Sequence, residues 1–145
     1  MALEPEKKQK LRTIAYWVAT ILGPASFVIG GVLFLARAEQ PSTALAELGY
    51  PPYLLKILGV WKIGGAVTSV LPGLPRLKEW MYAGFFFELT GAAASHALAG
   101  QPVGKVLQPV LFLVFVLASW ALRPASRRLP NLTSLTNPGE ARVPA

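Results

Sequence analysis

The chain has no cysteine, no aspartate and a single histidine, His96, among its 145 residues. Without cysteine it cannot form disulfide bonds, bind an iron–sulfur cluster through thiolates or carry out dithiol redox chemistry. One histidine cannot supply a bis-histidine haem or a multi-histidine zinc site, and a Ser–His–Asp triad needs an aspartate. We therefore expect no metal site and assign no catalytic residue.

Charge is also scarce, because only 14% of the residues are charged, against roughly 25% in typical soluble domains. Hydrophobic residues make up 53% of the chain, which is typical of a membrane protein. Lys and Arg number 14 against seven acidic residues, and the formal net charge is +7. The basic residues lie at the edges of apolar runs, where they would meet lipid headgroups. The charge therefore predicts contact with a bilayer and no binding of nucleic acid.

Four apolar runs account for most of the chain. Residues 13–36 contain no charge and exceed the ~20 residues that cross a bilayer, with a bend expected at Pro24. Three more spans are predicted at residues 53–71, 80–98 and 104–122. Ala36-Arg37-Ala38 resembles a signal-peptide cleavage site, but the apolar run before it is longer than the ~7–15 residues usual there.

The regions outside the spans complete the predicted organisation. Residues 1–12 form a basic cytoplasmic N-terminus, residues 13–123 a membrane domain, and residues 124–145 a disordered cytoplasmic tail. The loop between the first two spans has the signals of a short helix from Pro41 to Leu48, with Gly49 as its cap.

The distribution of basic residues predicts the orientation. Four spans put both termini and the turn between the second and third spans on one side, which then carries ten basic residues, whereas the other side carries two or three. The ten are Lys7, Lys8, Lys10, Arg12, Arg76, Lys78, Arg123, Arg127, Arg128 and Arg142. This asymmetry predicts an all-α, four-helix bundle integral to the inner membrane, with both termini cytoplasmic.

Lys62 and Glu88 are the charges expected deep inside spans, where an unpaired charge is costly. They lie 12 residues before and 14 residues after Leu74 in the intervening turn, so their depths differ by about 3 Å at ~1.5 Å per residue. We expect them to form a buried ion pair. Small residues at helical spacing from each, at 65, 66 and 69 and at 91, 92 and 95, predict a close approach of the two spans. The pair is either purely structural or part of a site that binds a ligand or moves a proton.

Ser95, His96 and Gln108 are expected at one level near the outer ends of the third and fourth spans. Together they predict the polar mouth of a pocket that hydrogen-bonds a quinone carbonyl or a similar headgroup. The alternative is an interfacial histidine that hydrogen-bonds backbone or water. No acidic residue lies near His96 in the sequence.

Several motifs in the middle of the chain occur in a known family. They are LGYPPYL at residues 48–54, LGVWK at 58–62, LPGLPRLKEWMYAGF at 71–85 and GAAASH at 91–96. In this order they resemble the DoxX-like membrane proteins. The resemblance implies a four-helix integral membrane protein of the DoxX superfamily. Some members of the wider group are linked to quinone-coupled sulfur oxidation or to oxidative-stress complexes, but most DoxX-like members have no established activity.

Three functions are compatible with these observations. The first, which we favour, is an accessory or binding subunit that has no cofactor of its own and holds a quinone or another lipophilic molecule. Its ligand-binding residues are Lys62, Glu88, Ser95, His96 and Gln108, and its protein partner is a redox enzyme or a second copy. The second is a membrane enzyme in which Glu88 or His96 transfers a proton on a lipophilic substrate. The third is an assembly factor without a ligand.

Overall fold

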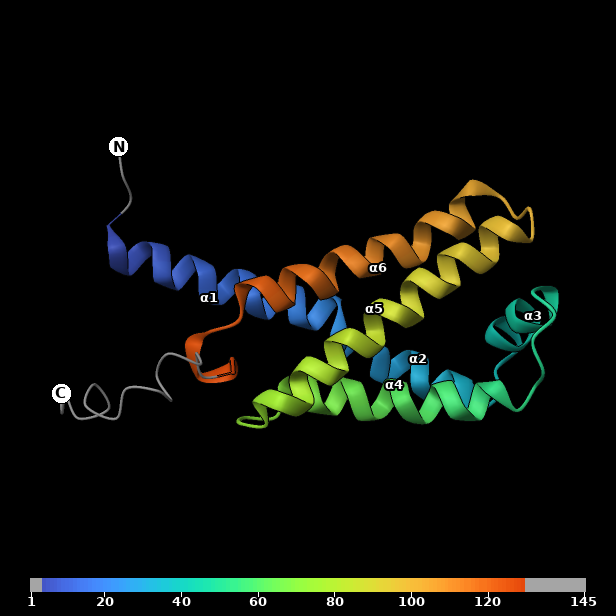
Figure 1. The fold of residues 1–145 in the computed structure, drawn as a ribbon, viewed down its shortest axis with the longest axis horizontal. Helices are drawn as coiled ribbons and strands as arrows, with labels where there is room; N and C mark the ends of the chain where they lie inside the picture. The colour runs from blue at the N-terminus through green and yellow to red at the C-terminus, as the bar shows by residue number, and fades with distance from the viewer. Residues whose placement is uncertain (1–3, 130–145) are drawn as a thin grey trace.

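The computed structural model describes residues 4–129, and within them every regular element is helical (Figure 1). The all-α prediction is confirmed. In chain order the elements are α1 (Pro5–Leu22), η1 (Pro24–Ser26), α2 (Phe27–Leu35), α3 (Glu39–Glu47), α4 (Leu54–Val70), α5 (Pro75–Leu98), α6 (Val103–Leu122) and η2 (Ala125–Arg127). Of the predicted tail, residues 130–145 lie outside the described part.

The first apolar run bends at Pro24, as expected, because proline has no N–H to continue the helical ladder. A single 3₁₀ turn, η1, joins α1 to α2 there, and Ser26 Oγ donates hydrogen bonds to the carbonyls of Gly23 and Leu22. The combined stretch Pro5–Leu35 is long and apolar enough to cross a membrane, and so is α6. Helix α4, with 17 residues, and helix α5, which carries Arg76, Lys78, Glu79 and Glu88, do not meet the same criterion.

Helix α3 covers one end of the bundle, opposite the end where α1 begins (Figure 1). It ends as the sequence predicts: Gly49 has φ +76°, and the N–H groups of Gly49 and Tyr50 donate to the carbonyls of Ala46 and Leu45. This is the Schellman arrangement, which favours glycine because of the positive φ. The turn sends the chain back toward the start of α4.

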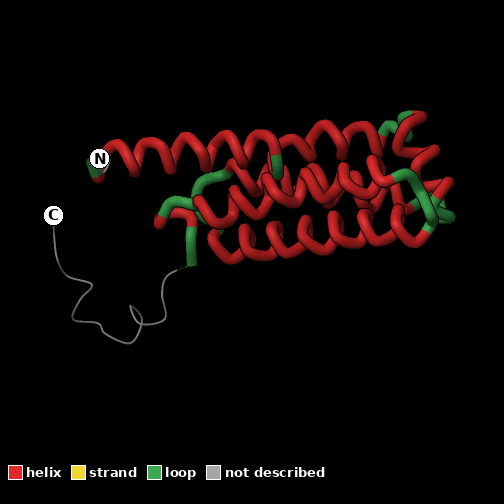
Figure 2. The backbone as a smooth tube through the Cα atoms, turned by 90° about the horizontal axis from the view of Figure 1, so that it is seen from above, coloured by secondary structure: helices red, strands yellow, loops and turns green. Residues whose placement is uncertain are grey.

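The helices run side by side as two closely packed pairs, α2 with α4 and α5 with α6, while α1 packs on α6 (Figure 2). The predicted close approach of α4 and α5 through small residues is wrong. A Cβ at Gly91 would meet nothing within 4 Å, and the ring of Phe85 covers Gly65. The close approach is instead between α2 and α4, where a Cβ at Gly31 would lie 2.8 Å from the carbonyl oxygen of Gly59. The bulk of Phe85, which the small-residue stripes did not include, holds α5 away.

Aromatic and aliphatic side chains fill the middle of the bundle. The rings of Phe27 and Phe85 stack with centroids 4.6 Å apart, and Met81, Leu89 and Val116 belong to the same buried cluster. Figure 1 shows α4 and α5 diverging from their connecting turn toward the end where α3 lies.

Two cations close the C-terminal end of α4. Lys78, fully buried, donates to the carbonyls of Thr68 and Leu71, and Arg127 donates to those of Ser69 and Val70. The last carbonyls of a helix lack partners within it and carry partial negative charge, so both cations are favourable there. Arg127 belongs to η2, so residues 125–127 of the predicted tail fold back onto the bundle.

The α2–α4 contact predicts a stability effect that depends on which glycine is changed. Gly31→Ala places a Cβ 2.6 Å from the Ile63 side chain and against backbone, so we expect a loss of about 1–3 kcal/mol. Gly64→Ala, on the same helix pair but facing open space, is the control and should be neutral or stabilising by up to ~1 kcal/mol. Denaturant titration of both variants in detergent micelles measures the difference. Equal stability of the two variants would contradict the packing.

Candidate functional site

The expected ion pair is present at the widening between α4 and α5. Lys62 Nζ lies 2.5 Å from Glu88 Oε1, and the two side chains are only 8% and 19% exposed. The matching depths inferred from the sequence are therefore correct. A pair this sheltered is costly to desolvate, and the attraction between the two groups offsets part of that cost.

Aromatic faces surround the ammonium. Lys62 Nζ lies 4.6 Å from the ring centroid of Phe27 and 5.1 Å from that of Phe34, both on α2. Cation–π attraction favours a cation at these distances. An ammonium has three N–H donors, and among residues 4–129 Glu88 is its one ion-pair or hydrogen-bond partner. Lys62 therefore keeps donor capacity for a further acceptor.

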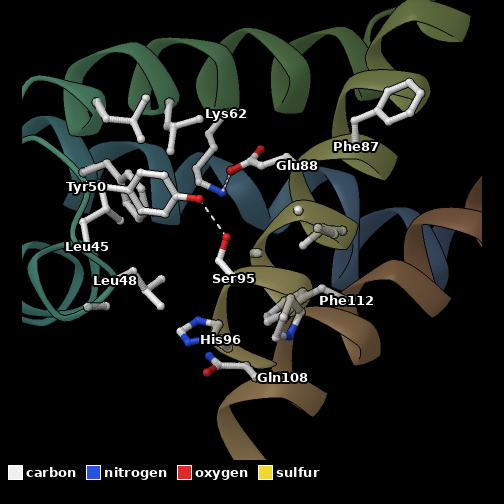
Figure 3. A pocket seen from close by; sticks show the side chains of 18 of the residues that line it. Leu45, Leu48, Tyr50, Lys62, Phe87, Glu88, Ser95, His96, Gln108 and Phe112 are labelled. Carbon is white, nitrogen blue, oxygen red and sulfur yellow. Dashed lines mark hydrogen bonds and ion pairs between the residues drawn. The ribbon is translucent and has the colours of Figure 1, made fainter. Parts of the chain in front are cut away.

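A pocket of about 410 Å³ opens beside the pair, between α2, α3, α4, α5 and α6. Figure 3 shows how the polar side chains converge on it. All five residues that the sequence predicted as ligand-binding line this pocket: Lys62, Glu88, Ser95, His96 and Gln108. Their role in binding a ligand stays a prediction, but they lie around one space.

The polar groups form separate sets within largely apolar walls. Lys62 and Glu88 form one, and Ser95 Oγ hydrogen-bonds the hydroxyl of Tyr50 at 2.7 Å to form the second (Figure 3). His96 and Gln108 form the third. A few placed polar groups among apolar and aromatic walls are typical of small-molecule sites. Tyr50 lines the pocket, whereas the nearby Tyr53 does not and is 63% exposed.

A second hollow of about 830 Å³ lies beneath α3 and adjoins the pocket, since Lys62, His96 and Gln108 are among the residues that line both. Glu39 and Glu47 of α3 also line it. Helix α3 therefore covers this end of the site.

Glu47 joins α3 to the rest of the bundle. Its carboxylate accepts hydrogen bonds from Lys105 Nζ at 2.6 Å and from the Gln101 amide at 3.2 Å, and the Gln101 oxygen lies 3.2 Å from His96 Nδ1. The expectation that no acid lies near His96 is thus wrong in space, because the loop brings Glu47 across. The hydrogen bonds from Lys105 and Gln101, with the charge of Lys105, hold the pKa of Glu47 below its ordinary value of 4.5.

Sequence reasoning missed Glu47, Tyr50 and Gln101. Each lies next to a helix end whose positive-φ glycine, Gly49 or Gly100, turns the chain back over the pocket. The glycines are visible in the sequence, but the direction in which such a turn carries the next residue depends on tertiary packing.

The fold and the site define an all-helical protein, within residues 4–129, that has a pocket beside a sheltered charged pair and two helical stretches apolar enough to cross a membrane. Residues 18–119 match the model of the DoxX-like family, so the chain belongs to that family, whose members are membrane-associated. No curated protein and no solved structure matches the chain.

The ion pair predicts strongly coupled substitutions. Lys62→Met or Glu88→Leu alone leaves one buried charge unpaired, and we expect each to cost about 3–5 kcal/mol. The double variant removes both charges and should recover most of that loss. Thermal unfolding in detergent of the two single variants and the double variant gives the coupling energy. Additive losses would show that the two charges do not depend on each other.

The contacts of Glu47 predict a pH-dependent attachment of α3. Because the pKa is lowered in the folded chain, the attachment is complete above about pH 4.5 and is lost as pH falls through the lowered pKa. The chain has no cysteine, so Ala46→Cys and Val103→Cys accept a pair of spin labels without background. Distances between the labels should broaden below that pH. In Glu47→Gln the distribution should already be broad at pH 7, and a narrow one there would contradict the role of this carboxylate.

Proposed function

We propose that this protein binds a lipophilic small molecule with a hydrogen-bonding head, with a quinone as the favoured class, beside Lys62 and Glu88. The observation that carries the proposal is the pocket itself. Its volume of about 410 Å³ lies within the ~300–1,000 Å³ usual for small-molecule sites, and it is lined by the charged pair and by four further polar side chains, those of Tyr50, Ser95, His96 and Gln108.

The chemistry of the walls suits a planar carbonyl compound. The spare donors of Lys62 hydrogen-bond a carbonyl oxygen and polarise it, while Glu88 keeps the ammonium in place. The rings of Phe27, Phe34 and Phe112, all of which line the pocket, provide flat apolar contact for a ring. Electron transfer to or from such a ligand then falls to a partner redox enzyme.

The pocket also bears on the two alternative functions. An assembly factor without a ligand calls for a solid core at the level of the ion pair, and the open space there favours a binding function instead. A proton-transferring enzyme needs Glu88 or His96 next to the reacting atom. Both residues line the pocket, but Glu88 is engaged by Lys62 and His96 Nδ1 by Gln101, which favours roles in holding a ligand.

We further propose that α4 and α5 cross the inner membrane as well, with both termini cytoplasmic. Pairing of Lys62 with Glu88 removes from lipid the charges that make these two helices less apolar than α6. Single cysteines introduced into the cysteine-free chain test this topology. An impermeant thiol reagent applied from outside should label Thr43→Cys and leave Gly73→Cys unlabelled, whereas the reverse pattern would contradict the orientation.

Filling the pocket should abolish binding without disturbing the fold. A Cβ at Gly91, which lines the pocket, meets nothing within 4 Å, so Gly91→Leu extends into open space. We expect it to weaken binding of a short-chain benzoquinone by about tenfold or more, because the added side chain occupies the ligand's volume. Equilibrium binding to the purified protein in nanodiscs measures the effect.

Gly104→Leu is the matched control, since Gly104 also faces open space but lines none of the hollows around the ion pair. It should bind the benzoquinone like the unaltered chain. The proposal fails if the unaltered protein binds no benzoquinone, or if Gly91→Leu binds as well as the control.

A further inference from the structure

A third hollow, a groove of about 450 Å³, follows the gap between α4 and α5 toward their connecting turn. It adjoins the pocket, because Leu58 and Glu88 line both. The two hollows therefore lie on either side of the same pair of residues, one of which carries the carboxylate of the ion pair. From there the groove leads away from α3 and toward the end of the bundle where the turn lies (Figure 1).

The walls of the groove are apolar and reach the outer surface of the bundle. Trp61 and Trp80, which stand on its two sides, are 71% and 77% exposed. Thr68 also lines the groove, and its hydroxyl already donates a hydrogen bond of 2.8 Å to the carbonyl of Gly64. Apart from Glu88 at one end and the indole N–H groups of Trp61 and Trp80 at its exposed rim, the described side chains that line the groove are apolar or, like Thr68, already hydrogen-bonded.

Two glycines give the groove its depth. Gly64 on α4 and Gly84 on α5 both line it, and a Cβ on either would meet nothing within 4 Å. Larger residues at these positions would fit the helices and would occupy the groove.

The hollow beneath α3, on the other side of the pocket, is the more polar of the two. Apolar residues such as Ile29 and Leu33 line it, but so do Glu39, Glu47, Lys105 and His96. A long hydrocarbon chain would desolvate these polar groups without replacing their hydrogen bonds, which is costly. An apolar extension of a bound ligand is therefore better accommodated in the α4–α5 groove.

We propose that the groove holds the flexible apolar tail of the ligand, so that the ligand class is an amphiphile with a hydrogen-bonding ring and a prenyl or acyl tail. This inference rests on the proposed function, which supplies the head. The ring lies beside Lys62, and the tail passes Glu88 and Leu58 and runs between Trp61 and Trp80 toward lipid. A second copy of the chain is the alternative occupant, but the position of the groove next to the pocket and its largely apolar walls favour a tail.

The experiment compares two benzoquinones that share one ring, one with a methyl group and one with a decyl chain, on the purified protein in nanodiscs. Gly64→Leu and Gly84→Leu should each weaken binding of the decyl compound by about tenfold or more, as displacement of two buried methylene groups would. Binding of the methyl compound should stay unchanged in both. Gly104→Leu controls for the glycine-to-leucine change and for partition of the decyl compound into the lipid.

The outcomes separate the two proposals. If Gly64→Leu and Gly84→Leu bind both compounds as the unaltered chain does, the groove does not hold the tail, and the proposed binding of the ring beside Lys62 is unaffected. Equal weakening of both compounds also overturns the tail site, because the groove then acts on the head. A shift in oligomeric state by native mass spectrometry, with ligand binding intact, assigns the groove to a second copy. If the unaltered protein binds neither compound, the proposed function fails as well.

Discussion

A buried ammonium and a buried carboxylate that pair across two helices constrain the whole structure. Helix α4 packs mainly on α2, and α5 packs mainly on α6, so Lys62 and Glu88 connect two helix pairs that diverge from a common turn. Each charge is tolerated in an apolar interior only while the other is within reach. The ion pair therefore links the α2–α4 pair to the α5–α6 pair at a level where few other side chains bridge them. The pocket lies beside the ion pair, between these two helix pairs.

The two ends of the gap are closed by different means. Toward the connecting turn, stacked Phe27 and Phe85 fill the interior, and Lys78 and Arg127 satisfy the last carbonyls of α4. Toward the other end, α3 covers the site and is joined by Glu47 to Lys105 and by Tyr50 to Ser95. Contacts between exposed polar groups are weak compared with a packed core. The α3 end of the site is thus held less firmly than the end at the connecting turn.

Most of the helices and the pairing of Lys62 with Glu88 could be predicted, because both follow from local pattern and from residue counts about the turn at Leu74. Interhelix packing could not. The small residues Gly91 and Ala92 suggest that α5 packs closely on α4, but the ring of Phe85 occupies the space against Gly65 of α4. The close backbone contact is instead between Gly31 of α2 and Gly59 of α4. The positions of Glu47 and Tyr50 depend on how a loop folds over the bundle, which periodicity does not encode.

The central claim is that the space beside the ion pair is a ligand site and not a packing gap. Native mass spectrometry of the protein released from its own membranes, with no ligand added, tests it most directly. The account predicts that a discrete lipophilic compound stays bound to the unaltered chain and that Lys62→Met/Glu88→Leu, folded but without the charged pair, loses it. An unaltered chain that emerges bare, or a double variant that keeps the same compound, would contradict it.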